Sequence, residues 1–346
     1  MQNGNFRIML LAAAIAAGAS NEVLANLNSS YQFTGTGNWS IDGLGANTTP
    51  VGTLQASIPV GATVEKAFLY SSLYSLSGPI SSPSVTFEGL TLSGASWTSL
   101  GNYQPQPGPN PNFWLGAYRA DVTAHVTTLA GGGSASLFNW TVNSETPNSN
   151  VDGEVLAVVY SLPTETTRTI AFLDGFSTSA GDITTVNFAG PLTAAQLVDP
   201  SLLSLGIGFG AGGSQFSTVD INVAGNRLTS SAGGANDGSV VNGALITVGG
   251  IGDNPANPVN PNSNSSPDDE LYTLNPFLSV GMTSFDIRTQ NPSLDDNIFF
   301  AGLNVTAPAT IIVEPPNRVP DAGSTALLLS LACPGLWLCR RMVRKA

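Results

Sequence analysis

Cysteine and histidine are almost absent from this chain. Both cysteines, Cys333 and Cys339, lie near its C-terminal end, and His125 is the only histidine. Residues 26–318 therefore have no disulfide, no thiol nucleophile and no cysteine ligand for a metal. A body of about 290 residues without disulfides must be held together by its hydrophobic core, and a chain of that length can build one.

Positive charge is also scarce. Residues 26–318 contain 21 acidic and six basic side chains, because Glu22, Asp321 and five of the eleven basic residues lie outside, and their net charge is −15. Nucleic acids bind through phosphates that need Lys and Arg, and anionic lipid surfaces attract the same side chains. We therefore expect neither as a partner of this stretch.

Long amphipathic helical patterns are missing, while Gly, Ser, Thr and Asn are abundant. Short apolar or alternating runs recur between Gly-, Pro- and Asn-rich turns, a pattern typical of antiparallel β-structure. The sequence predicts an all-β, jelly-roll-like sandwich with one helical turn at residues 193–198. Strands are expected at residues 67–70, 84–87, 117–126, 136–142, 155–160, 169–173, 203–209, 218–223, 244–248, 284–289 and 298–305.

Two pairs of segments indicate an internal duplication. SVTFEGLTL (residues 84–92) parallels DINVAGNRL (220–228), and SLFNWTV followed by VDGEVLAVVY parallels SFDIRTQ followed by LDDNIFFAGL. The second match gives Asp152 and Asp295 equivalent positions. We predict two tandem sandwiches, residues 26–163 and 164–306, with one large sandwich as the alternative.

No pattern specific to catalysis is found. The run GIGFGAGG (residues 206–213) lacks the lysine of a phosphate-binding loop. Alternation places His125 on one strand face with Arg119, Asp121 and Thr123, and no serine sits in a nucleophile elbow. We expect no catalytic residue and no enzyme activity.

The alternative function is a carbohydrate-binding module or a glycoside hydrolase. Hydrolysis needs two carboxylates about 5–10 Å apart, and Asp152 with Glu154, or Glu154 with Asp174, are the candidates. Trp97 and Trp114, near the polar excursion at residues 104–112, are the candidates for stacking on sugar rings.

Clustered acids at strand entrances predict calcium as a ligand. The cluster residues are Asp152, Glu154, Asp268, Asp269, Glu270, Asp295 and Asp296. Calcium takes six to eight oxygen ligands from such groups. The alternative is that these acids close turns by bonding to their own backbone.

The N-terminal residues have the features of a secretory signal peptide. Arg7 precedes an apolar stretch at residues 8–17 and small-residue cleavage sites. We expect cleavage after Ala25. At the other end of the body, residues 307–318 form a Pro-rich linker that is expected to be extended.

The last 28 residues combine a short motif, an apolar run and a basic end. The motif is Val319, Pro320, Asp321, Ala322, Gly323 and Ser324, the run covers residues 326–339, and the basic residues are Arg340, Arg341, Arg344 and Lys345. At about 1.5 Å per residue the run spans about 21 Å as a helix, whereas a stable membrane span needs about 20 residues. We expect transient insertion in the inner membrane with the basic end inside, and an ordinary single-pass anchor is the alternative.

This tail resembles the PEP-CTERM class of exosortase sorting signals, in a variant with Val-Pro-Asp in place of Pro-Glu-Pro. The resemblance implies export by a bacterium with an outer membrane, cleavage near the motif by an exosortase-type enzyme, and release or attachment at the surface. The body, through segments such as GATVEKAFLYSSLY (residues 61–74), is similar to uncharacterised exported proteins with such tails. We therefore expect a non-enzymatic surface or extracellular-matrix protein that acts in adhesion or in a biofilm matrix, with extracellular polysaccharide as a candidate partner.

Overall fold

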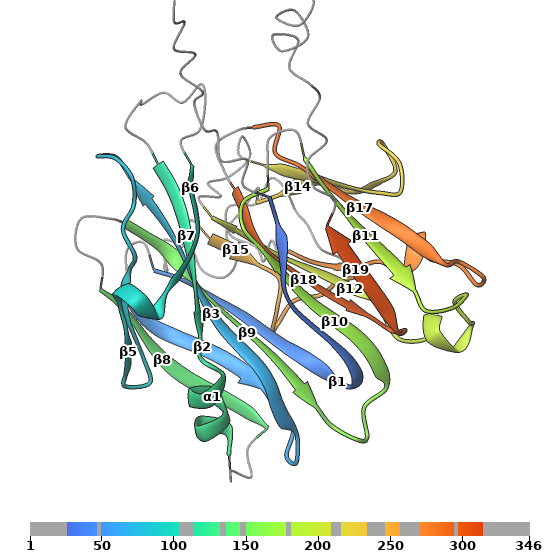
Figure 1. Cartoon of the computed structure of the whole chain (residues 1–346), viewed down its shortest axis with the longest axis horizontal. Coiled ribbons are helices and arrows are strands. Elements are labelled where there is room, and N and C mark those ends of the chain that lie inside the picture. Colours follow the sequence, from blue (N-terminus) through green and yellow to red (C-terminus); the bar gives the residue numbers. More distant parts are fainter. Residues whose placement is uncertain are drawn as a thin grey trace, which may run out of the picture.

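The computed structural model describes residues 26–46, 50–103, 114–131, 136–145, 150–177, 181–208, 216–233, 246–256, 270–293 and 297–313. Strands dominate this part of the chain (Figure 1). They are β1 (Asn28–Gly45), β2 (Val51–Ser57), β3 (Thr63–Ser75), β4 (Ser84–Phe87), β5 (Leu90–Leu92), β6 (Thr98–Tyr103), β7 (Trp114–Asp121), β8 (Leu137–Glu145), β9 (Asn150–Ser161), β10 (Thr167–Asp174), β11 (Asp182–Phe188), β12 (Leu202–Gly208), β13 (Ser217–Ile221), β14 (Arg227–Ala232), β15 (Ile246–Val248), β16 (Leu271–Thr273), β17 (Ser284–Gln290), β18 (Asn297–Val305) and β19 (Ala309–Val313). The helical elements are α1 (Thr123–Ala130) and the 3-10 turns η1 (Gly94–Ser96), η2 (Ala195–Leu197) and η4 (Asn275–Phe277).

Strand β1 is bent and belongs to both halves of the molecule. Its residues 28–36, which we call the N-arm, pair with β10, and its residues 37–45, the C-arm, pair with β9. Since β9 and β10 are consecutive strands joined by a short turn, β1 follows both by bending between Thr36 and Gly37. Figure 1 shows this bend in the blue strand labelled β1.

Each half has the strand order of a jelly roll. In the first half the inner sheet runs C-arm–β9–β3–β7 and the outer sheet runs β2–β8–β4–β5. In the second half the inner sheet runs β10–β18–β12–β15 and the outer sheet β11–β17–β13–β14. Counted along the chain, both halves show inner order 1-8-3-6 and outer order 2-7-4-5, the arrangement of two interleaved Greek keys. The predicted all-β, antiparallel, jelly-roll-like sandwich is confirmed.

The segments that look repeated in the sequence occupy equivalent places. Residues 84–92 form the β4–β5 hairpin and residues 220–228 lie in the β13–β14 hairpin. Likewise β8 and β9 correspond to β17 and β18. The shared order supports a duplication. Strands β6, β16, β19 and the N-arm are additions to the common pattern.

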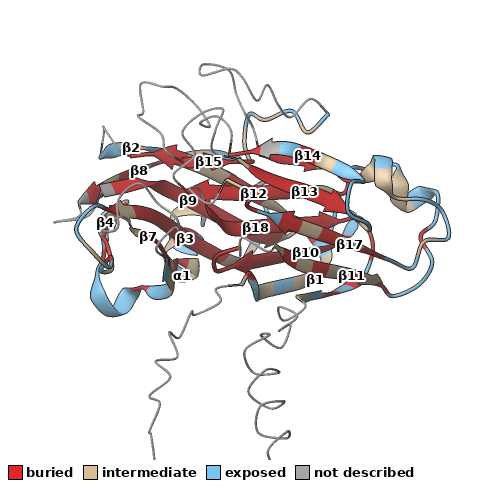
Figure 2. Cartoon of the chain, turned by 90° about the horizontal axis from the view of Figure 1, so that it is seen from above, coloured by how far each residue is buried: buried red, intermediate tan, exposed pale blue. Residues whose placement is uncertain are grey.

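Three hydrophobic cores hold the four sheets together. One lies between the inner and outer sheets of the first half, and another lies in the same place in the second half. The third lies between the two inner sheets, where the ring centroids of Tyr70 and Phe300 are 4.9 Å apart and those of Phe68 and Phe172 are 6.4 Å apart. Both faces of each inner sheet are therefore buried, as the red strands at the centre of Figure 2 show.

Two predictions need correction. The boundary expected between residues 163 and 164 does lie in the β9–β10 turn, but the N-arm (residues 28–36) pairs with β10 of the second half and so does not belong to the first sandwich. The strand predicted over residues 117–126 is wrong beyond Asp121. There the Asp121 carboxylate accepts hydrogen bonds from the Thr123 N–H (3.0 Å) and hydroxyl (2.6 Å), and this local bonding ends the strand and starts helix α1.

The helical turn predicted at residues 193–198 is confirmed as η2. Within the described part of the chain, no helix combines the length and apolar character needed to span a lipid bilayer. The predicted signal peptide, most of the linker and the sorting tail, including Val319–Ser324 and the basic end, lie outside the described residues.

Candidate functional site

A buried polar cluster lies between the two inner sheets. Tyr70 (β3) and Arg119 (β7) come from the first half, and Asp174 ends β10 in the second half. The Tyr70 hydroxyl donates to Asp174 Oδ2 over 3.2 Å, and Arg119 Nη1 donates to the same oxygen over 2.5 Å. We call these three residues the inter-half triad, because the only carboxylate in it belongs to one half and both donors belong to the other.

Alternation along β3 explains why these side chains meet. Leu69 points into the first-half core, so Phe68 and Tyr70 point to the opposite face, toward the second half. Phe68 supports the triad, because its ring lies 4.7 Å from the Arg119 guanidinium. Arg119 packed against this ring keeps a fixed orientation toward Asp174.

A second cation lies at the edge of the triad. Lys66 Nζ is 5.5 Å from the Phe68 ring centroid and 5.6 Å from that of Tyr31 in the N-arm. It also pairs with Asp121 at 3.1 Å, but this pair is much more exposed than the triad. Lys66 therefore lies at the outer margin of the inter-half contact, beside Phe68 of the first half and Tyr31 of the N-arm.

Burial controls the protonation of the triad. Desolvation raises the pKa of Asp174, and the nearby Arg119 guanidinium opposes that rise. Burial, with the Asp174 charge, raises the pKa of Tyr70 well above its usual value. Tyr70 is fully buried, so its hydroxyl cannot reach a substrate. The arrangement is suited to joining the halves, and not to proton transfer with a ligand.

The two predicted acids of β9 lie on opposite faces of the first inner sheet. The register between β3 and β9 skips Asp152, so this residue is bulged out of the ladder. Asp152 Oδ2 accepts from the Ser72 hydroxyl over 3.1 Å, while Glu154 Oε1 accepts from the neighbouring Ser71 over 3.4 Å. Both acids are fully buried. Neither can therefore contact a sugar, and the carboxylate pair of the hydrolase alternative is not accessible in this structure.

Burial also controls the protonation of Glu154. Desolvation raises its pKa to about 7. Its Oε2 is buried without a hydrogen-bond partner among the described residues. A carboxylic acid that is neutral at mildly acidic pH fits this environment better than a carboxylate does.

Glu270 is a buried structural anchor. Its Oε1 accepts from the Gly233 N–H (2.6 Å) and the Thr247 hydroxyl (3.2 Å), and its Oε2 accepts from the Tyr272 hydroxyl. These bonds connect Glu270 to the residue that follows β14 and to the middle residues of β15 and β16, so Glu270 organises the backbone around the edge of the second inner sheet.

The calcium prediction is only partly covered by the structure. Asp268, Asp269, Asp295 and Asp296 lie outside the described residues. Among the described ones, no three His, Cys, Asp or Glu side chains gather to hold a metal ion. Asp152, Glu154 and Glu270 thus form no metal site with one another, and calcium stays a prediction that depends on the other four acids.

The two predicted stacking residues differ in environment. Trp97 is only 8% exposed and packs in the first-half core, so the stacking role predicted for it is wrong. Trp114, at the start of β7, is partly buried and packs against the same core.

His125 is a helix residue and not a strand residue. Its Nε2 lies 3.1 Å from the Phe87 carbonyl oxygen, and its ring meets Phe87 edge-on. The expected common face with Arg119 and Asp121 is therefore not formed, and His125 instead links α1 to the β4–β5 hairpin.

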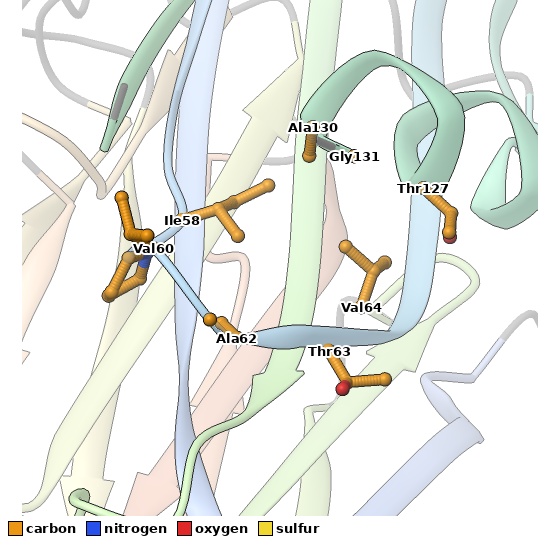
Figure 3. A pocket seen from close by; sticks show the side chains of 10 residues that line it. Ile58, Val60, Ala62, Thr63, Val64, Thr127, Ala130 and Gly131 are labelled. Carbon is orange, nitrogen blue, oxygen red and sulfur yellow. The ribbon is translucent and has the colours of Figure 1, made fainter. Parts of the chain in front are cut away.

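One pocket of about 310 Å³ lies between the β2–β3 turn and the C-terminal end of α1. Figure 3 shows Ile58, Ala62 and Val64 on one side of it and Thr127 and Ala130 of α1 on the other. No ionisable side chain lines it, so it has no group for acid–base chemistry.

Sequence reasoning did not find Tyr70 or Ser72, because aromatic and serine residues in strands are common. The scarcity of basic residues was a usable signal, since Arg119 is one of only six in the body. A comparison of the chain with protein-family models, curated proteins and solved structures gave no match.

Proposed function

We propose that this protein is a non-enzymatic component of a bacterial cell surface or extracellular matrix. The observation that carries the proposal is the inter-half triad with its surrounding aromatic core. Two jelly rolls are joined there through buried side chains into one body that needs no disulfide. An acidic, cysteine-free body whose two halves share a buried core is suited to a scaffold role in adhesion or matrix building.

Export is the second part of the proposal. The signal-peptide features of residues 1–25 and the motif, apolar run and basic end of residues 319–346 support it. An exosortase-type enzyme would cleave near Val319–Ser324 after transient insertion of the tail in the inner membrane. The mature protein would then be released or attached at the surface.

The burial of the strand acids bears on the choice between a scaffold and a hydrolase. Asp152, Glu154 and Asp174 are bonded within the fold and shielded from solvent. A hydrolase needs two carboxylates that face a substrate. The described acids that sequence reasoning selected for that role are therefore better explained as parts of the core.

The test is fractionation of the native organism with mass spectrometry of both termini. We expect the protein in the surface or extracellular fraction, an N-terminus at Asn26, and no peptide from residues 333–346. Recovery of the intact 333–346 peptide from the surface-exposed form would contradict tail processing. Recovery from the cytoplasm alone would contradict export.

A further inference from the structure

The N-arm is a lightly held strand at the edge of the second half. None of its residues 28–36 is buried, in contrast to the C-arm and to β10. The preceding residue, Leu27, is 1% exposed and packs in the second-half core. The arm is therefore attached by one buried apolar plug, by the backbone ladder with β10, and by the partly buried rings of Tyr31 and Phe33, which pack against the core between the inner sheets.

A few side-chain bonds complete the attachment. The Ser30 hydroxyl donates to the Phe172 carbonyl over 2.9 Å, and the hydroxyls of Thr34 and Thr169 are 3.1 Å apart. Gln32 bonds to both polar groups of β19 that face it, donating to the Ala309 carbonyl and accepting from the Ile311 N–H. The partners of these hydrogen bonds belong to the second half, and the first-half Lys66 also lies beside the arm, with its Nζ 5.6 Å from the Tyr31 ring centroid.

The rest of β1 belongs to the first half. The C-arm pairs with β9, and the two arms meet at the bend between Thr36 and Gly37. Gly35 and Gly37 flank the bend, and the Phe33 ring lies 2.9 and 3.0 Å from where their β-carbons would be. The bend thus has the small residues that a change of direction between two sheets requires.

We propose that the N-arm is an exchangeable strand through which copies of this protein join. β1 straightens at its bend, and the N-arm of one copy takes the place beside β10 of another copy, with its Leu27 in the second-half core of that copy. At about 3.3 Å per residue, nine residues extend about 30 Å from the first half, which is enough to cover all of β10.

The exchange is possible because it preserves nearly all contacts. The arm, its ladder, its plug and its side-chain bonds are the same in both states, and only the bend differs, so concentration determines the balance. Each copy offers one arm and one β10 edge, which allows either a reciprocal pair or an open chain. This inference deepens the proposed matrix role, but it concerns the purified chain and does not depend on export.

The experiment uses the full-length chain with Cys333→Ser and Cys339→Ser as background. One sample carries Thr34→Cys and another carries Thr169→Cys, and the two are mixed at high concentration, warmed and oxidised. A disulfide between the two different chains requires that the arm of one copy pairs with β10 of the other. We expect at least about fivefold more of this heterodimer than in the control mixture.

The control mixture combines Thr86→Cys with Thr91→Cys. These residues also face each other across a strand pair, with hydroxyls 3.5 Å apart, but both lie in the short β4–β5 hairpin. Any disulfide between those chains measures random collision. Heterodimer in the arm mixture at or below this level would overturn the proposal.

A second measurement does not depend on those single variants. Light scattering of the unmodified protein should show larger species that increase with concentration. In the double variant Thr34→Cys/Thr169→Cys, oxidation at low concentration should lock the arm within its own chain and prevent those species, and reduction should restore them. Absence of concentration-dependent species in the unmodified protein, or their persistence in the locked variant, would also overturn the proposal.

Discussion

Replacing Arg119 with Met tests the role of the inter-half triad directly. Met keeps much of the aliphatic volume beside Phe68 but removes the guanidinium that lies 2.5 Å from Asp174. The Asp174 side chain, which is 7% exposed, then keeps Tyr70 as a donor but loses its counter-charge. The expected result is a large loss of stability.

The magnitude follows from burial. Removing one partner of a buried ion pair costs about 3–5 kcal/mol, because the remaining charge is left without compensation. The Arg119 side chain is 20% exposed, so solvent offsets part of the loss and we expect about 3 kcal/mol. For a body of this size, each kcal/mol lowers Tm by about 2–4 °C, which gives a decrease of about 6–12 °C.

The matched control is Lys66→Met. Its pair with Asp121 is more exposed, at 26% and 53%, so we expect a loss below about 1 kcal/mol. Calorimetry and urea unfolding measure both variants. Since the triad joins the halves, Arg119→Met should also broaden or divide the unfolding transition.

A double variant separates charge from packing. In Arg119→Met/Asp174→Asn the uncompensated charge is gone, so most of the lost stability should return. A loss no larger than that of Lys66→Met, or a double variant no more stable than Arg119→Met, would refute the reasoning that this buried charge is held by its arginine.

Three further predictions concern other parts of the molecule. The pKa of Glu154 is raised from 4.5 to about 7, so the stability that its protonated form contributes is fully present below about pH 4.5 and is lost as the pH rises through 7, where the buried group ionises. Glu154→Gln cannot ionise, so in urea unfolding it should be more stable than wild type by up to about 3 kcal/mol at pH 8 and similar to wild type at pH 4. Leu27→Ala should cost about 2–5 kcal/mol through the cavity in the second-half core, whereas Val51→Ala at a half-exposed edge should change stability by less than about 1 kcal/mol in the same assay. Millimolar calcium should raise Tm and a chelator should lower it, and Asp295→Ala with Asp296→Ala should remove that response; an unchanged Tm of the wild type under chelation would contradict the calcium prediction.

The strands were predictable because their signal is local. Alternation over a few residues, with Gly- or Asn-rich turns between, is enough to find β4, β10 or β18 in the sequence. The equivalence of the β4–β5 and β13–β14 hairpins was also predictable, since both segments have a glycine, Gly89 or Gly225, followed three residues later by a leucine. The alternation of a strand and the similarity of two hairpins can each be recognised within a few consecutive residues.

The candidate site was not predictable to the same extent, because its contacts are not local. Tyr70 and Asp174 are 104 positions apart in the sequence, and no pattern within β3 or β10 indicates that their side chains are in contact. The error at His125 has a different origin. The run from Arg119 to His125 has the alternation of a strand. The hydrogen bonds from Thr123 to the Asp121 carboxylate, however, end the strand at Asp121 and begin helix α1 at Thr123, so local side-chain bonding outweighs the alternating pattern here.

The two halves protect their exposed strand edges in different ways, and this difference bears on the exchange proposal. In the first half, side chains of the C-arm accept hydrogen bonds from backbone N–H groups at the edge strand β2. Asp42 accepts from the Gln55 N–H over 2.5 Å, and Ser40 accepts from the Ser57 N–H over 2.8 Å. In the second half, whole strands do this work, since β19 covers β11 and the N-arm covers β10.

Removing the N-arm would therefore expose more than one row of backbone groups. The β10 edge would lose its ladder, and β19 would lose the two bonds from Gln32. Uncovered edges of this kind readily accept a strand from another chain. An arm that leaves its own half thus creates the site that the arm of another copy fits, and the cost of opening is recovered only when a second copy is present. This is why the proposed exchange should depend on concentration, and why locking the arm to Thr169 should abolish it.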